Sequence, residues 1–394
     1  MRKAFICPTK YVQGENELLN LGYFVKTFGK KALLIADPFA LNLVKEKLEA
    51  TQKKYGVEFV SCDLFKGECS RTVVKALQEF AKANKCNCTI GLGGGKAIDT
   101  SKCVAAGNAL IICPTIAATD APTSHSAVLY TDNHEFDDYA YFRQSPSVVL
   151  IDLNVIANAP SRFLVSGMGD ALSTYFEARA NVNSVSNVNA GLPCGADRKK
   201  GTLLGYGTYT AAALAELCYR NLISDGAKAK AACDCNVVTP AFEKIVETNI
   251  LLSGLGFESG GLAAAHAIHD GLTAIHDIHS CCMHGEVVAF GTICQLVLEN
   301  SPEEELYEVL NFCDEVGLPV CLHDLMTNPR TGEVIREELT EEEYKIVAAK
   351  TCIPDESIHN MPFPVTEDMV IAAIKAADKI GHDFRYGCDC ECCH

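Results

Sequence analysis

The sequence predicts an α/β fold in two parts: an N-terminal doubly wound domain built on a parallel sheet, followed by an all-α C-terminal domain. Three observations predict this architecture. The chain has 394 residues, more than one hydrophobic core usually supports, so two domains are expected. Short apolar runs alternate with helical patterns as far as about residue 160. Beyond that point, long Ala- and Leu-rich segments with helical periodicity dominate to the end.

Four apolar runs in the N-terminal part are typical of strands, and helical patterns separate them. The expected strands are residues 31–37, 57–65, 86–93 and 109–115, and the helices between them are 39–56, 70–85 and 95–107. Strands that are apolar throughout have both faces buried, and helical connections make successive strands parallel. A doubly wound sheet is therefore expected.

The C-terminal part is expected to be helical because its apolar residues recur at the spacing of a core-facing helix. The clearest helical segments are 162–180, 209–232, 239–258 and 285–300. The boundary is expected near Ala159 and Pro160, which gives domains of residues 1–158 and 159–394. Residues 189–207 combine Gly, Pro and charge, so an exposed insertion is expected there.

Composition and charge restrict the kinds of partner. Lys and Arg number 34 against 50 Asp and Glu, a net charge of −16, and the longest basic cluster is residues 198–200. This balance argues against nucleic acid and anionic membranes as partners. No apolar run has the length of a signal peptide or of a transmembrane helix, about 18 residues. A cytoplasmic location is the default expectation.

The 21 cysteines do not indicate a disulfide framework, because the chain is long and shows no secretory signal. Most are expected to be reduced and structural, since residues such as Cys103 and Cys113 lie within apolar patterns. Residues 388–394 hold four cysteines and one histidine. This end could chelate a soft metal, or it could be a frayed terminus rich in thiols.

A glycine-rich stretch at residues 91–102, GLGGGKAIDTSK, follows an expected strand and opens a helix. Backbone N–H groups at such a helix N-terminus can hold a pyrophosphate, and glycine allows its close approach. Lys96 stands where the last glycine of the usual G-x-G-x-x-G would be, so an ordinary tight turn is the alternative. Asp37, which ends an earlier strand, could bind a ribose or cap the helix after Pro38.

Five of the eleven histidines lie in residues 260–286, which indicates a metal site. They are His266, His269, His276, His279 and His284. Two pairs among them are three residues apart, so each pair could share one helix face. His266 and His284 would be about 27 Å apart on one unbroken helix, so they can meet only if the chain breaks between them. Spacing alone leaves the ligands open, and a histidine without metal is the alternative for each.

Four blocks of sequence match one family when they are taken together: residues 91–102, 113–132, 155–180 and 256–291. They closely resemble glycerol dehydrogenases of the iron-containing, or metal-dependent, alcohol dehydrogenase superfamily, in the same order over most of the chain. The resemblance implies an N-terminal domain that binds NAD. It also implies a helical domain with one divalent metal, usually zinc, at the cleft between the domains, and a homo-oligomer, an octamer in this family.

The resemblance assigns residues to the metal and to the substrate. The family's metal ligands correspond to Asp170, His266 and His284. An Asp, two His and an open position form a catalytic arrangement, because a divalent ion lowers the pKa of a coordinated alcohol. The same donors suit Fe(II), Mn(II) or Co(II) as well as zinc. Asp120 matches a residue that contacts the polyol, and His269 is either a substrate or proton-relay contact or a packing neighbour.

The resemblance also assigns the cofactor groove. Asp37 would take the adenosine ribose and favour NAD over NADP. The residues that would hold the pyrophosphate are Gly93, Gly94, Gly95, Lys96 and Ala97. Those that would line the rest of the groove are Thr115, Ile116, Ala117, Ala118, Ser124, Ser126 and Tyr130.

The implied reaction is oxidation of glycerol or a related vicinal diol by NAD⁺, giving dihydroxyacetone or a hydroxyketone and NADH. One alternative is a lyase or cyclase similar to dehydroquinate synthase, and another is a sn-glycerol-1-phosphate dehydrogenase. Both act on phosphorylated substrates, and the blocks around Asp170 and His266 contain few of the Lys and Arg residues that phosphate needs. A metal-sequestering protein that uses its cysteines is the third alternative. Residues 189–207 and 388–394 depart from the family pattern.

Overall fold

The computed structural model describes residues 1–195, 203–329, 331–336 and 338–387. The N-terminal part is built on a six-stranded sheet in which every pairing is parallel. In sheet order the strands are β1 (Tyr11–Gly14), β8 (Val148–Asp152), β5 (Leu110–Pro114), β4 (Cys88–Gly93), β2 (Lys31–Ile35) and β3 (Glu58–Val60). The four expected strands are all present. Strand β3 is shorter than expected because it lies at the edge and pairs only with residues 31–33 of β2.

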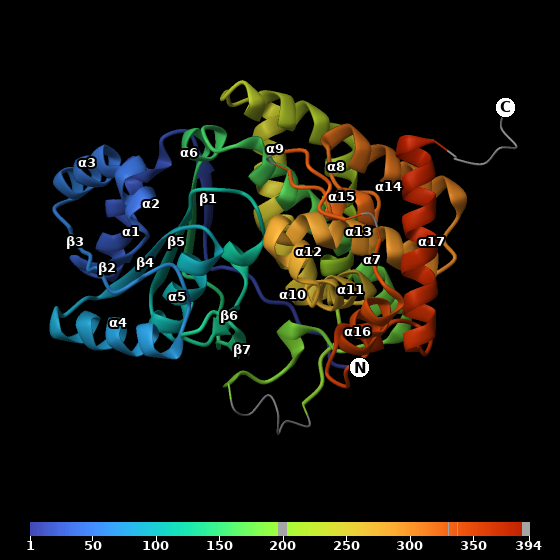
Figure 1. The fold of residues 1–394 in the computed structure, drawn as a ribbon. Coiled ribbons are helices and arrows are strands. Elements are labelled where there is room, and N and C mark those ends of the chain that lie inside the picture. The colour runs from blue at the N-terminus through green and yellow to red at the C-terminus, as the bar shows by residue number, and fades with distance from the viewer. Residues whose placement is uncertain (196–202, 330, 337, 388–394) are drawn as a thin grey trace, which may run out of the picture.

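Helices cover both faces of the sheet, as the continuous apolar strands require. The side chains of β2 alternate between two cores: Ala32 and Leu34 pack on one face, Leu33 and Ile35 on the other. The first face is covered by α1 (Leu21–Phe28), α2 (Pro38–Leu43) and α3 (Lys45–Tyr55), and the second by α4 (Arg71–Ala83) and α5 (Gly95–Ala105). The predicted doubly wound domain is confirmed (Figure 1).

An antiparallel hairpin lies beside this sheet and was not expected from the sequence. It consists of β6 (Ser126–Tyr130) and β7 (Phe136–Tyr141). Only one face of β6 is buried, through Ala127 and Leu129, and β7 is mostly exposed or half-buried. A hairpin with so little buried apolar surface gives no clear strand pattern.

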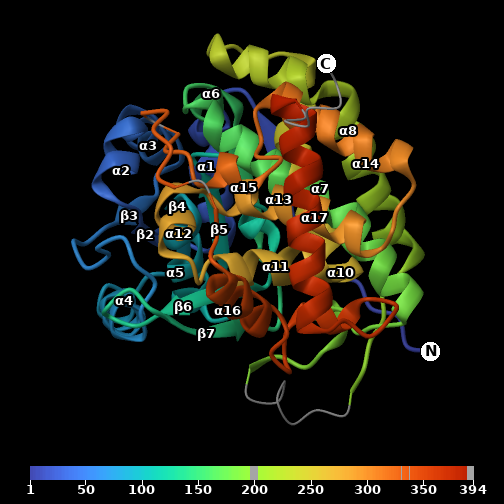
Figure 2. The same ribbon diagram turned by 45° about the vertical axis from the view of Figure 1, so that its right-hand side comes forward.

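The C-terminal part is helical, as expected. Its elements are α6 (Leu153–Ala157), α7 (Ser161–Ser184), α8 (Tyr209–Asp234), α9 (Pro240–Glu247), a π-helical turn η5 (Thr248–Leu252), α10 (Ser253–Gly260), α11 (Ala264–Leu272), α12 (His276–Cys281), α13 (His284–Leu298), α14 (Glu303–Val316), α15 (Leu322–Leu325), α16 (Glu341–Thr351) and α17 (Glu367–Tyr386). Helix α7 is buried along most of its length and packs against α8, α10 and α13. Helix α17 lies across the front of this part in Figure 2.

The predicted boundary at residue 158 falls in the short link between α6 and α7. The first residues of the chain nevertheless contact the helical part: Arg2 donates to the carbonyl of Gly191 at 2.6 Å, and the N–H of Ile6 donates to Ser259 at 3.1 Å. Of the predicted insertion at 189–207, residues 196–202 lie outside the described residues, as does the cysteine-rich end at 388–394. Within the described ranges, no helix combines the length and apolarity needed to cross a membrane.

Candidate active site

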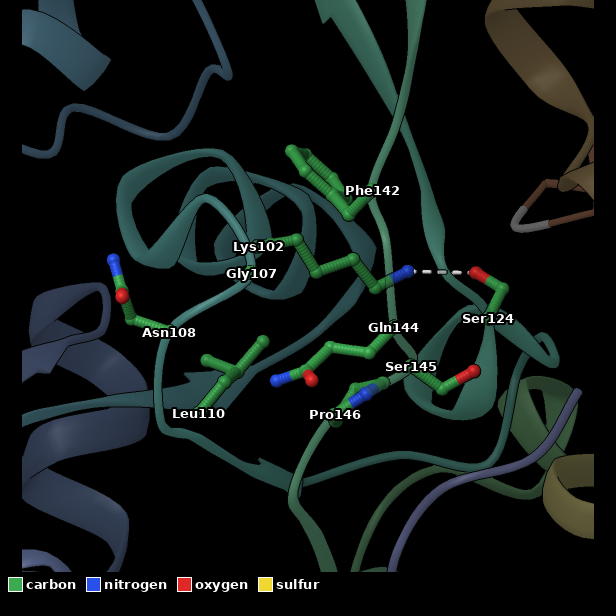
Figure 3. Close-up of a pocket in the computed structure, with 9 residues that line it drawn as sticks. All are labelled: Lys102, Gly107, Asn108, Leu110, Ser124, Phe142, Gln144, Ser145 and Pro146. Atoms are coloured by element: carbon green, nitrogen blue, oxygen red, sulfur yellow. Dashed lines mark hydrogen bonds between the residues drawn. The ribbon is translucent and has the colours of Figure 1, made fainter. Parts of the chain in front are cut away.

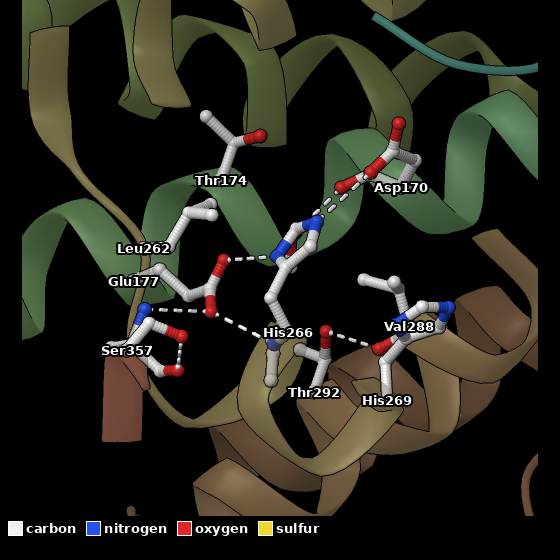
Figure 4. Close-up of polar contacts among 12 residues, drawn as sticks. Asp170, Thr174, Glu177, Leu262, His266, His269, Val288, Thr292 and Ser357 are labelled. Atoms are coloured by element: carbon white, nitrogen blue, oxygen red, sulfur yellow. Dashed lines mark hydrogen bonds and ion pairs between the residues drawn. The ribbon is translucent and has the colours of Figure 1, made fainter. Parts of the chain in front are cut away.

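Three helices bring one carboxylate and two imidazoles together. Asp170 lies in the middle of α7, His266 in the first turn of α11, and His284 at the start of α13. Asp170 Oδ1 is 3.3 Å from the Nε2 atom of each histidine, and one ligand atom from each residue lies within 4.8 Å of the others. Asp170 is buried, and Figure 4 shows its carboxylate next to the ring of His266. Asp/His/His with the three donor atoms converging on one point is a donor set that fits a divalent metal.

The chain between the two histidines breaks twice, which is why residues eighteen apart can meet. Helix α11 ends at Leu272, the short α12 follows, and α13 starts at His284 itself. The regularly spaced pair His276 and His279 lies on α12, where both side chains are exposed. Helical spacing alone offered this pair and the pair His266 and His269, whereas the structure brings His266 and His284 to Asp170.

Two glycines allow α7 and α13 to approach each other at this point. A Cβ atom added to Gly169 would lie 2.2 Å from the carbonyl oxygen of Gly285, and one added to Gly285 would lie 1.7 Å from the carbonyl oxygen of Ser166. Side chains at either position would push the helices apart. These glycines precede Asp170 and follow His284 directly, so they set the distance between the carboxylate and the imidazole.

A buried glutamate holds His266, and sequence reasoning missed it. Glu177 is fully buried, and its Oε2 lies 2.6 Å from His266 Nδ1. Its Oε1 accepts the backbone N–H groups of Ala263 at 2.8 Å and of His266 at 3.0 Å. The Nδ1 atom therefore carries a proton, and Nε2 faces Asp170, which is the carboxylate–histidine arrangement found behind metal-binding imidazoles. The available signal was the seven-residue spacing from Asp170, two turns along the same helix face.

Neighbouring charges shift the pKa values of Asp170 and His266 in this cluster. Burial alone would raise the pKa of Asp170, but His284 and His266 outweigh burial and hold this pKa below its usual range. Burial likewise would lower the pKa of His266, but Glu177 and Asp170 outweigh it and raise this pKa well above its usual value. An ionised carboxylate therefore lies at the centre of the cluster, where a cation would be favoured.

Asp120 lies next to this cluster, on the segment that follows β5. Its backbone N–H donates to Asp170 Oδ2 at 3.3 Å, and its own Oδ2 accepts from the hydroxyl of Ser253 at 2.8 Å. Burial and the nearby charge of Asp170 raise the pKa of Asp120 well above its usual value. Ser253, at the start of α10, is a site neighbour that the sequence did not reveal.

His269 lies behind His284. Its Nε2 is 3.0 Å from His284 Nδ1, and its Nδ1 is 2.9 Å from Asp270 Oδ1. Burial and the neighbouring His284 lower the pKa of His269 to about 4, so its imidazole is neutral at pH 7. The structure thus places this residue against a predicted metal ligand.

The glycine-rich stretch has the local geometry of an anion site. Strand β4 ends at Gly93 and α5 begins at Gly95, where a Cβ would meet nothing within 4 Å. Gly93 has φ +139, a conformation that other residues rarely adopt. Asp37 caps α2, accepting from the N–H of Ala40 at 2.9 Å through Oδ1, while its Oδ2 lies 3.6 Å from the Cβ position of Gly93. The capping role predicted as an alternative is present, and it leaves the second oxygen beside the glycine stretch.

The segment after β5 connects this stretch to α7. The N–H of Thr115 donates to the carbonyl of Gly93 at 3.1 Å, and Ile116 lies 3.3 Å from the Cβ position of Gly94. The carbonyl of Ala117 accepts from Asn249 at 3.1 Å. The next carbonyl, that of Ala118, accepts from Ser166 on α7 at 3.4 Å. A continuous series of contacts therefore connects the predicted cofactor groove to α7, the helix that carries Asp170.

The remaining groove residues contact charged side chains, of which sequence reasoning missed Lys102 and Glu68. The fully buried Lys102 donates to the hydroxyl of Ser124 at 2.7 Å (Figure 3). It also donates to the carbonyl of Ser126 at 2.7 Å. The Lys96 ammonium pairs with Glu68 at 2.7 Å and lies 5.8 Å from the centre of the Tyr130 ring. The next residue in α5, Ala97, is buried in the core that α5 shares with β2 and α4.

Comparison with known proteins identifies the family. The model of iron-containing alcohol dehydrogenases matches residues 8–153. Glycerol dehydrogenase of Escherichia coli O6:H1 is 44% identical over 98% of this chain and 99% of its own length, and glycolaldehyde reductase of Halobacterium salinarum is 39% identical over 98% and 100%. The crystal structure of glycerol dehydrogenase from Schizosaccharomyces pombe superposes with a TM-score of 0.87, at 37% identity over 97% of this chain and 92% of that one. The resemblance to glycerol dehydrogenases is confirmed, and the chain belongs to the iron-containing alcohol dehydrogenase family.

Proposed function

We propose that the protein catalyses NAD-dependent oxidation of glycerol, or of a related vicinal diol, to dihydroxyacetone or the corresponding hydroxyketone. The observation that supports this most directly is the convergence of Asp170, His266 and His284 next to Asp120, in a chain whose relatives are named glycerol dehydrogenases. A site for one metal ion beside a second carboxyl group suits a substrate with two adjacent hydroxyls, because the ion can coordinate one hydroxyl oxygen and Asp120 can hydrogen-bond to the other.

Asp170, His266 and His284 are the proposed ligands of one divalent metal. Three protein ligands leave an open coordination position for substrate, as in catalytic zinc sites. One carboxylate oxygen and two imidazole nitrogens suit Zn²⁺, which we propose as the ion, although the same set also binds Fe²⁺ and Mn²⁺.

NAD is the proposed cofactor, and residues 1–158 are the proposed unit that binds it, with residues 159–394 holding metal and substrate. The open N-terminus of α5 supports a pyrophosphate at Gly93 to Ala97, and the second oxygen of Asp37 supports a ribose contact. The strip from Thr115 to Ala118, with Ser124, Ser126 and Tyr130, continues from there toward the metal cluster.

When bound, the metal supplies Lewis acidity toward the alcohol and the nicotinamide accepts the hydride. Side chains and glycines of this chain hold the proposed metal ligands and Asp120 in place. Glu177 fixes the ring of His266, and Gly169 with Gly285 sets the helix spacing. Ser253 occupies one oxygen of Asp120, which leaves Oδ1 for a substrate hydroxyl. We propose Asp120 as the polyol contact, with His269 as a second residue close to the reaction.

The test is turnover of the purified protein with NAD⁺ and a panel of glycerol, 1,2-propanediol, 2,3-butanediol and hydroxy acids, before and after chelation of metal. We expect NADH to form with the vicinal diols and to cease on chelation. Asp170→Asn should abolish turnover, because the central charge and ligand are lost, whereas His279→Gln, an exposed histidine of the same segment, should not change it. A lack of turnover with every vicinal diol would contradict the proposal.

The 39% identical glycolaldehyde reductase supports a second candidate, reduction of glycolaldehyde with NADH. This reaction also interconverts a hydroxycarbonyl and a vicinal diol, so the same site could carry it. The ratio of kcat/KM for glycolaldehyde and for dihydroxyacetone decides between the two.

We also propose a cytoplasmic homo-oligomer, with the octamer of the family as the expected assembly. The mass of the purified protein from light scattering tests the assembly.

A further inference from the structure

We propose that His269 and Asp270 form a positioning pair that holds His284 in the tautomer able to bind the metal. The inference rests on the proposed metal site and adds two residues that do not touch the metal themselves. It gives His269 a definite role: it acts through His284, and its own contact with substrate is not required.

The contacts form a single line. Asp270 Oδ1 is 2.9 Å from His269 Nδ1, and His269 Nε2 is 3.0 Å from His284 Nδ1. The line continues across the second ring, since His284 Nε2 is 3.3 Å from Asp170 Oδ1. The two imidazoles meet edge to face, with centroids 4.3 Å apart.

The direction of each hydrogen bond in this line is determined from its outer end. An ionised carboxylate can only accept, so His269 Nδ1 carries the proton. With this proton on Nδ1, His269 Nε2 presents its lone pair 3.0 Å from His284 Nδ1, which we infer to be the donor. That leaves His284 Nε2 with its lone pair, pointed toward the side of Asp170.

The competing tautomer of His284 would carry its proton on Nε2. That proton would be well placed to donate to Asp170, only 3.3 Å away, and it would block the lone pair that a metal needs. Without His269 nothing in the observed contacts of His284 favours the binding tautomer over this one. Two ligands of the cluster therefore have separate supports: His266 has Glu177 on α7, and His284 has the pair on α11.

Zinc affinity separates this role from general packing. His269→Leu removes the acceptor while keeping a side chain of similar bulk, and we expect the dissociation constant for Zn²⁺, measured by competition with a chromophoric chelator, to rise about 10- to 100-fold. His269→Gln can place an amide oxygen near the position of Nε2, so it should retain most of the affinity. His279→Leu is the matched control, because His279 is exposed on the neighbouring helix, and its affinity should equal that of the unsubstituted protein.

The tautomer itself is visible by ¹⁵N NMR of histidine-labelled, metal-free protein, which does not depend on activity or on any variant folding. We expect the ¹⁵N shifts of His284 to report a protonated Nδ1. A His284 with its proton on Nε2 and none on Nδ1 would overturn the inference. Equal zinc affinity of His269→Leu and the unsubstituted protein, or an equal loss in His269→Gln and His269→Leu, would also overturn it.

These outcomes differ from a failure of the proposed site. If unsubstituted protein binds Zn²⁺ no better than Asp170→Asn, the metal site itself is wrong. If Asp170→Asn loses zinc and His269→Leu keeps it, the metal site stands and only the positioning pair fails.

Discussion

Glu177 controls the proton of His266 through both of its oxygens. Two backbone N–H groups hold one oxygen, so in Glu177→Gln the amide oxygen should occupy that place and the NH₂ group should face His266 Nδ1. The ring would then have to accept at Nδ1 and carry its proton on Nε2, where the metal should bind. We expect zinc affinity to fall about 10- to 100-fold, as for other partners of metal-binding histidines.

Competition with a chromophoric chelator measures this loss, and Glu303→Gln, an exposed glutamate of α14, is the control. Unchanged zinc binding in Glu177→Gln would mean that the carboxylate has only a packing role.

Single residues also show which parts of the candidate site could be predicted from the sequence. Residue type and clustering indicated a metal site among five histidines, but helical spacing offered two pairs, His266 with His269 and His276 with His279, and left the ligands open. The choice of His266 and His284 depends on two chain breaks and on a partner almost a hundred residues earlier, and the family resemblance, not the spacing, supplied it. Glu177 was missed because a buried glutamate in an Ala-rich helix looks like any other residue of that helix.

Gly285 determines how closely α13 approaches α7. An alanine at an early helical position normally stabilises a helix by up to about 1 kcal/mol relative to glycine. Here the new methyl would lie 1.7 Å from a backbone carbonyl of α7, so the helices must separate, at a cost of about 1–3 kcal/mol. The clash outweighs the helix preference, and His284 moves away from Asp170.

We therefore expect Gly285→Ala to lower both the melting temperature and the zinc affinity. Thermal unfolding and chelator competition measure the two effects. Gly14→Ala, whose Cβ would meet only a glutamate oxygen at 3.7 Å, should leave both unchanged. A normal zinc affinity in Gly285→Ala would show that the helix contact does not set the ligand distance.

The prediction of elements succeeded where strands and helices are buried over several residues. Strands β2, β4 and β5 are mostly apolar and buried over nearly all of their length, and α7, α8 and α13 carry long apolar faces. Strand β1 has four half-buried residues at the sheet edge, and the hairpin of β6 and β7 is mostly open to solvent, so neither shows a clear period. One expected helix, residues 39–56, is divided into α2 and α3 at Val44.

The proposed metal ligands come from three helices, so a bound metal should stabilise the whole helical part. Asp170, His266 and His284 lie on α7, α11 and α13, and α7 also contacts the strip after β5 through Ser166. A ligand that binds only the folded state stabilises it by about 2.7 kcal/mol at a free concentration one hundred times its dissociation constant. We expect chelation to lower the melting temperature and added Zn²⁺ to restore it.

Asp170→Asn separates this site from any other zinc-binding group, because its melting temperature should not respond to Zn²⁺. The cysteines of residues 388–394 are the main competing ligands in the sequence, so a chain ending at residue 387 is the second control. A zinc-dependent rise that persists in Asp170→Asn and disappears in the shortened chain would assign the stabilisation to the cysteines. A zinc-dependent rise that disappears in Asp170→Asn and persists in the shortened chain would mean that the ion binds between α7, α11 and α13 and stabilises their packing.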